Sequence, residues 1–136
     1  MIIYFIYFFL LNVILDIGSS KTNLCISNKP SVFFILLFHH LINSFILLGC
    51  ISDNLIVLLV HFFTIIITAF YWKYNKNNCD LTLLVNKMCG WNETLPFNDI
   101  FNIIGLKKIK KWNEFWHYLI IMISGIISFS KIIIKL

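Results

Sequence analysis

Apolar residues are grouped along this chain into long runs that shorter polar stretches separate. Two of these runs, 31–50 and 55–72, flank a short break that contains Asp53. Each run is about 18 to 20 residues long, which is the length an α-helix needs to cross a hydrocarbon core of roughly 30 Å. The pattern therefore predicts a helical hairpin inside a membrane.

Two further runs lie at the ends of the chain. The first, 1–17, covers about 22 to 26 Å as a helix and suits a thin bilayer. Its alternative is a cleaved signal peptide, but residues 1–10 carry no Lys or Arg, and no small-x-small cleavage site lies near Ser19. We therefore expect a retained span there, and a last span at 115–134.

The whole chain, 1–136, is expected to be one all-α membrane domain. It is a bundle of four transmembrane helices, near 1–17, 31–50, 55–72 and 115–134. Residues 18–30 are expected to form a polar loop. Residues 73–114 are expected to form an amphipathic loop with one or two short interfacial helices, of which one is capped by Asp80 or Thr82 and ends at Gly90.

Composition supports a membrane protein. The chain is 60% hydrophobic and 12% charged, with a mean hydropathy of +0.87, whereas soluble domains carry about a quarter charged residues. A water-soluble fold of this size could not hide four such runs in one core. Every cation is Lys, and Arg and Gln are absent from the sequence, a bias typical of an AT-rich genome.

The net charge of +5 lies mostly in the loops. The loops at 18–30 and 73–114 hold nine of the eleven Lys, so the positive-inside rule predicts that both are cytoplasmic and both termini are outside. Four Lys precede the last span and are expected to contact anionic lipid headgroups: Lys107, Lys108, Lys110 and Lys111. We predict the lipid bilayer as their partner and no nucleic acid. The choice among a host, viral or organellar membrane stays open.

Polar residues recur inside the two runs of the hairpin. The first run carries His39, His40, Asn43 and Ser44 near its middle. The second carries, on one helix face, His61, Thr64 and Thr68. Polar groups at this depth rarely face lipid and pair with one another instead. We therefore expect an interhelical hydrogen-bond network, a polar core, between the two helices.

Two other interpretations of the same residues remain open. In one, His40 and His61 hold a haem or a metal ion, since imidazole suits haem iron and most transition metals. No Gly lies near either histidine in the sequence to admit a macrocycle, and no Arg is present to hold propionates. In the other, these residues form a proton or ion relay, which is disfavoured on the expectation that the spans lack any Asp or Glu.

A set of residues between 33 and 90 follows a recognisable order: His40, Gly49, His61, Tyr71-Trp72, Asn77, Cys79 and Leu81-Thr82. This order resembles a group of small uncharacterised polytopic membrane proteins of large DNA viruses and bacteria. That group has His where this chain has Tyr71, and Glu where it has Val85 or Asn86. The resemblance implies a four-helix topology and no established activity. Its motif residues here are Trp72, Asn77, Cys79 and Thr82.

Three of the four cysteines, Cys25, Cys79 and Cys89, lie in loops on one predicted side. There is no CxxC pair, so a zinc knuckle is not expected. In an oxidising compartment Cys79 could pair with Cys25 or with Cys89, and their disulfide state stays open. Residues 92–94 form an N-glycosylation sequon, which matters only if this loop is lumenal.

The last span carries Ser124 and Ser128, a small-xxx-small edge along which a partner helix could approach closely. No catalytic constellation is recognised in the loops, so no enzyme is predicted. The sequence therefore favours a small multi-pass membrane protein that is a structural component or a subunit of a complex. The alternative is a redox membrane protein that binds haem or a metal through intramembrane histidines.

Overall fold

The computed structural model describes residues 2–75, 79–92, 100–105 and 110–136, with the side chains of 110–114 excepted. Within these ranges the chain is helical and contains no strand. The helices follow in the order α1 (Ile2–Ile17), α2 (Ser20–Asn28), α3 (Ser31–Leu48), the short 3-10 helix η1 (Gly49–Ile51), α4 (Leu55–Tyr74), α5 (Asp80–Cys89), α6 (Ile100–Ile103) and α7 (Lys110–Lys135). The predicted all-α fold is therefore confirmed.

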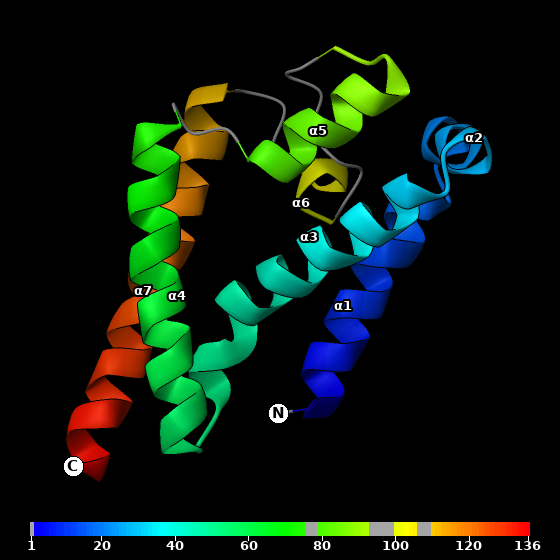
Figure 1. Ribbon diagram of the computed structural model, residues 1–136. Helices are drawn as coiled ribbons and strands as arrows, with labels where there is room; N and C mark the ends of the chain where they lie inside the picture. Colours follow the sequence, from blue (N-terminus) through cyan, green and yellow to red (C-terminus); the bar gives the residue numbers. More distant parts are fainter. Residues whose placement is uncertain (1, 76–78, 93–99, 106–109) are drawn as a thin grey trace.

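Helix α3 is the centre of the arrangement (Figure 1). It runs obliquely between α1 on one side and the neighbouring helices α4 and α7 on the other, and it contacts all three. Helices α2, α5 and α6 gather at the upper end of the molecule, and both termini lie at the lower end. Helix α2 of the segment 18–30 thus lies at the same end as α5 and α6, in agreement with the predicted topology.

Among the residues that the structure describes, three helical segments are long and apolar enough to cross a membrane: Ser31–Ile51, Leu55–Tyr74 and Phe115–Lys135. They agree closely with three of the predicted spans. The remaining prediction, 1–17, is α1, whose 16 residues cover about 24 Å. It meets the same criteria only together with α2, as a pair bent by 83°. By length and composition, the chain has the helices of a multi-pass membrane protein.

The predicted polar loop at 18–30 is wrong, because residues 20–28 form α2. Ser19 caps this helix, since its hydroxyl accepts a hydrogen bond from the amide of Thr22 at 3.4 Å. The helix buries Thr22 and Cys25, and it packs against α1 and α3. Tertiary contacts thus stabilise a helix that its polar composition did not indicate.

Two short helices, α5 and α6, lie between α4 and α7, as predicted. Gly90 ends α5 in the left-handed conformation, with φ 67°, which glycine adopts without a steric penalty. The N-cap of α5 is Cys79 and not Asp80 or Thr82. Asp80 instead lies in the first turn, where its negative charge interacts favourably with the helix dipole.

A disulfide between Cys25 and Cys89 joins α2 to the end of α5, with the two Cα atoms 5.6 Å apart. This pairing replaces the two that the sequence suggested. Cys79 and Cys89 lie at opposite ends of the same helix, about 15 Å apart, so they cannot bond to each other. Beside the bridge, Val32 and Leu36 of α3 pack against Val85 of α5 in a buried apolar cluster.

At the lower end, α7 is tied to the turn of the hairpin. Asn54 caps α4 through its side-chain oxygen, which accepts from two backbone amides of the first turn. Lys131 of α7 pairs with Asp53 at 3.2 Å and donates to the carbonyls of Ile51 and Ser52. The hairpin turn and the last helix are thereby held together.

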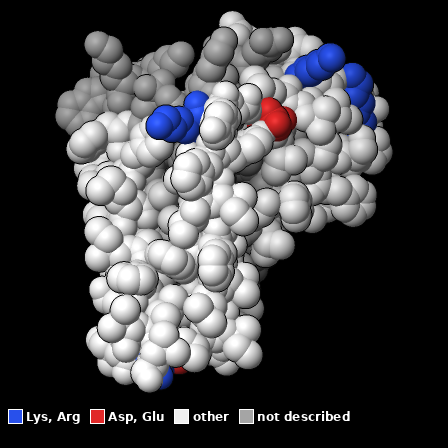
Figure 2. All heavy atoms as spheres, turned by 60° about the vertical axis from the view of Figure 1, so that its left-hand side comes forward, with Lys and Arg blue, Asp and Glu red and all other residues white. Residues whose placement is uncertain are grey.

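The outer surface fits a lipid environment. Figure 2 shows charged side chains gathered toward the upper end and the lower edge of one face, with a broad uncharged belt between them. Large apolar side chains are exposed on every candidate span, among them Phe34 on α3, Phe63 and Ile67 on α4, and Ile126 on α7. A soluble monomer rarely exposes so much contiguous apolar surface.

Candidate functional site

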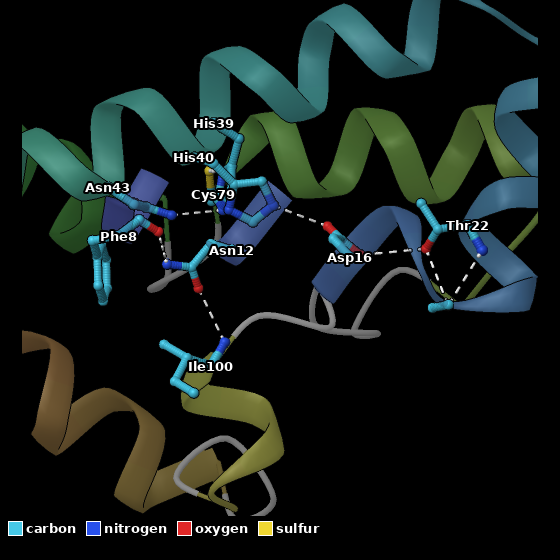
Figure 3. Close-up of polar contacts among 10 residues, drawn as sticks. Phe8, Asn12, Asp16, Thr22, His39, His40, Asn43, Cys79 and Ile100 are labelled. Atoms are coloured by element: carbon cyan, nitrogen blue, oxygen red, sulfur yellow. Dashed lines mark hydrogen bonds and ion pairs between the residues drawn. The ribbon is translucent and has the colours of Figure 1, made fainter. Parts of the chain in front are cut away.

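The first polar group in the interior joins α1 to α3. Asp16, in the last turn of α1, places Oδ2 3.1 Å from Nε2 of His40, and each of the two side chains is only 2% exposed. Thr22 of α2 donates to the other carboxylate oxygen at 3.3 Å (Figure 3). A buried carboxylate needs such partners, because desolvation of an unpaired charge costs several kcal/mol.

Asn12 lies one turn before Asp16 on α1 and holds α6 in place. Its amide nitrogen donates to the carbonyl of Phe8 at 2.8 Å, and its oxygen accepts from the backbone amide of Ile100 at 3.0 Å. That amide belongs to the first residue of α6, whose first-turn donors lack partners inside the helix. The inner face of α1 therefore carries two polar anchors, Asn12 and Asp16.

The second polar group joins α3 to the start of α5. Nδ1 of His39 lies 3.5 Å from Sγ of Cys79, and Nε2 of the same ring lies 2.7 Å from the amide nitrogen of Asn43. His39 is buried, whereas Asn43 and Cys79 are half-buried. A thiol, an imidazole and an amide thus form one chain of contacts, which Figure 3 shows beside the Asp16–His40 pair.

The third polar group lies on the opposite side of α3, between α4 and α7. His61 of α4 is fully buried, with Nδ1 2.7 Å from the hydroxyl of Ser128 and Nε2 3.0 Å from the carbonyl of Ile46. Gly49 gives the ring its space, because a Cβ at that position would overlap the imidazole. One histidine therefore connects α3, α4 and α7.

The predicted network between the two hairpin helices is divided in the structure. His39 and His40 bond toward α5 and α1, while His61 bonds toward α7 and to Ile46 on a different face of α3. A haem or metal held between His40 and His61 does not fit this arrangement, because both His61 nitrogens have hydrogen-bond partners. The expectation that no glycine lies near these histidines is also corrected, since Gly49 contacts His61 in space.

The other polar-core residues are less engaged. Thr64 and Thr68 are half-buried, and the Thr64 hydroxyl donates to the carbonyl of Val60 in its own helix at 2.8 Å. Ser44 is fully buried, and among the described residues its hydroxyl has no hydrogen-bond partner. Of the three polar residues predicted on one face of α4, His61 therefore makes the hydrogen bonds to neighbouring helices.

Two of the motif residues take structural positions near the upper ends of the helices. Trp72 of α4 packs edge-to-face on the ring of His117 in α7, with centroids 4.9 Å apart, and Thr82 is half-buried on α5. Asn77 lies outside the described residues. The motif positions Gly49 and His61, distant in sequence, are in contact, and Cys79 meets His39, the neighbour of the motif histidine His40.

The remaining predicted contacts lie on α7 and just before it. Ser124 and Ser128 are buried, and Ser128 contacts His61 of α4 in the same chain. Lys107 and Lys108 fall outside the described residues, and Lys110 and Lys111 are described only as the start of α7. Their contact with headgroups stays a prediction.

Sequence reasoning missed Asp16, the acid that the disfavoured relay lacked. The sequence did contain a signal for Asp16, because an ionisable residue at the end of an apolar run is a candidate for pairing with a buried polar group. The described residues contain no group of three His, Cys, Asp or Glu side chains placed to hold a metal ion. The sites they do contain are the buried pair Asp16–His40 and the chain Cys79–His39–Asn43.

A comparison with protein-family models found no match to this chain, and comparisons with curated proteins and with solved structures found none either.

Proposed function

We propose that this chain is a structural component of a membrane, on its own or as a small subunit of a larger complex. One observation carries the proposal: the ionisable residues at membrane depth bond across helices. Asp16 pairs with His40 between α1 and α3, and His61 joins α4 to α3 and α7. Polar groups used in this way fix the positions of helices in a bilayer.

The shape of the bundle supports a subunit role. Helix α1 packs against α3 and α6, whereas α4 packs against α7, and α3 is the span that contacts both sides. Much of the apolar surface of the spans is left for lipid or for other membrane helices, with Ile56 and Phe70 of α4 among the most exposed residues. The resemblance of residues 33–90 to uncharacterised polytopic membrane proteins points to the same class.

The test combines a spectrum with an assembly measurement. The protein is extracted from its membrane in mild detergent through a C-terminal tag, and its mass is measured by native mass spectrometry beside an ultraviolet–visible spectrum. We expect a colourless protein, alone or with stoichiometric membrane partners. A Soret band that disappears in both His40→Ala and His61→Ala would instead support the haem alternative and overturn the structural assignment.

A further inference from the structure

We propose that Cys79 is the nucleophile of an acyl-transfer site that accepts the acyl group of a membrane-lipid ester, with His39 as its base. This activity goes beyond the structural function and does not rest on it. The thiol precedes α5, where that helix crosses α3, and its sulfur lies 3.5 Å from Nδ1 of His39. Asn43 lies 2.7 Å from the other ring nitrogen.

These three side chains have the roles that thiol catalysis requires. A cysteine nucleophile needs a base within hydrogen-bond reach, and the base needs a third group to orient it. Here His39 contacts the sulfur through one nitrogen, while Asn43, one helical turn along α3, holds the other. The Asn43 amide lies with its nitrogen toward Nε2. A flip of the amide, which exchanges its nitrogen and oxygen, lets the oxygen accept the Nε2 proton, and Nδ1 then takes the proton of the thiol.

The start of α5 supplies donors for the charge that develops on the carbonyl oxygen. The first backbone amides of a helix lack partners within the helix and point out of its N-terminus. Cys79 is the N-cap of α5, and its side chain makes no capping hydrogen bond. The sulfur therefore belongs to the residue at which these amides begin, and these amides are assigned as the donors to the tetrahedral oxyanion.

The position of the thiol selects a lipid ester as the substrate class. Helix α4 ends at Tyr74, and Trp72, Lys73 and Tyr74 mark the boundary between hydrocarbon and water. Cys79 follows within five residues and is the N-cap of α5, a helix that lies at the same end of the molecule (Figure 1). Ester carbonyls of bilayer lipids lie in this interfacial layer, between the acyl chains and the headgroups.

Thiol–disulfide exchange is disfavoured by the same geometry. The bridge Cys25–Cys89 lies at the far end of α5, about 15 Å from Cys79, and the other free thiol, Cys50, lies beyond the opposite end of α3. No second thiol is therefore near enough, among the described residues, to resolve a mixed disulfide. An orienting amide and a helix N-terminus serve acyl transfer instead.

The reaction needs only the lipid and water. His39 removes the proton of Cys79, the sulfur attacks the ester carbonyl, and the carbon–oxygen bond breaks. The lipid alcohol leaves with the proton from His39, and the acyl group remains as a thioester. Water then attacks the thioester, His39 takes a proton from it, and a fatty acid and the free thiol are released.

The test follows the acyl group in the wild-type protein. The full chain, purified in detergent, is mixed with phosphatidylcholine that carries an ω-alkyne acyl chain, and acylated peptides are located by mass spectrometry. We expect the alkyne chain on Cys79, released by neutral hydroxylamine, and not on Cys50. Released ω-alkyne fatty acid is measured in the same sample. Absence of both acyl on Cys79 and released fatty acid, or equal labelling of Cys50, overturns the proposal and needs no variant to fold.

Variants then test the base. His39→Gln should lower the rate of acylation at least tenfold, because a positioned general base contributes about 10²- to 10⁴-fold. Cys79→Ser should lose the hydroxylamine-sensitive label, and Cys50→Ser, its matched control, should keep the wild-type rate. Intact mobility of the Cys25–Cys89 bridge on a non-reducing gel shows that each variant is folded. A folded His39→Gln protein that acylates at the wild-type rate contradicts the assignment of the base.

Discussion

Gly49 leaves empty the volume that the imidazole of His61 fills, so the end of α3 and the middle of α4 fit together through a glycine and a histidine. Gly49 has φ −61° and ψ −28°, ordinary helical values that alanine adopts equally well. A methyl group at position 49 would overlap the imidazole ring of His61, whereas the backbone conformation at this position would accept alanine without strain. The two residues therefore form a steric pair that substitution can test.

We expect Gly49→Ala to destabilise the bundle by about 1 to 3 kcal/mol, the usual cost of overpacking a tight core. In a His61→Ala background the same substitution should cost little, because the ring is gone. Gly125→Ala is the control, since its Cβ would lie 3.3 Å from one methyl group of Ile65. The measurement is the denaturant midpoint in detergent, and equal losses in both backgrounds would refute the steric pair.

The hydrogen bonds of His61 make a separate prediction. His61→Leu keeps much of the volume but removes the contacts with Ser128 and the Ile46 carbonyl, which should cost about 0.6 to 2 kcal/mol in a membrane bundle. The matched control is Ile67→Leu on the same helix, because the side chain of Ile67 is 67% exposed. The preceding residue, Ile66, is half-buried and is a poorer control. If the thermal or denaturant midpoints of the two variants coincide, the hydrogen bonds of His61 contribute nothing to the stability of the bundle.

The hydrophobic pattern was sufficient to predict the spans, because hydropathy and caps are local properties. The hairpin helices begin and end within a few residues of the predicted positions, and Asn54 caps α4 through its own side chain. Helix α2 was missed because its contacts lie outside its own segment: it packs on α3, and Cys25 pairs with a cysteine 64 residues away. Long-range contacts of this kind leave no periodicity in a nine-residue polar segment.

The candidate sites could be predicted in residue type but not in pairing. His39 and His40 are adjacent in sequence, so on a helix they point about 100° apart and meet different neighbours, Cys79 and Asp16. The sequence showed that both were polar groups at membrane depth. Only the packing of α1 and α5 on α3 decides which partner each histidine has.

The Asp16–His40 pair predicts an asymmetry between substitutions. Asp16→Leu leaves His40 buried without its acid, and breaking a buried pair costs about 3 to 5 kcal/mol. Asp16→Asn keeps one oxygen to accept from the Thr22 hydroxyl and places an amide N–H donor toward Nε2 of His40, so it should cost much less. Asp53→Asn is the control, because that carboxylate is 85% exposed and its pair with Lys131 should contribute less than about 1 kcal/mol. Similar denaturation midpoints for Asp16→Leu and Asp53→Asn would contradict a buried pair.

The disulfide predicts the orientation of the chain, in conflict with the distribution of Lys. A bridge between Cys25 and Cys89 forms in an oxidising compartment and is rare in the cytosol, so the end that carries α2 and α5 should be lumenal or extracellular. The positive-inside rule predicts the opposite. A covalent bridge between α2 and α5 is the stronger constraint, since the Lys bias also reflects codon usage.

Two measurements on the protein expressed in a secretory system decide between these orientations. Asn92 is exposed and lies three residues beyond Cys89, so its sequon should receive a glycan that Asn92→Gln abolishes. Under reduction the wild type should slow on a gel, whereas Cys25→Ser should run as the reduced form throughout and lose about 2 to 4 kcal/mol of stability. Cys50→Ser, which removes a free thiol at the other end, should change neither result. An unglycosylated protein with two freely alkylated thiols at Cys25 and Cys89 would restore the cytoplasmic orientation.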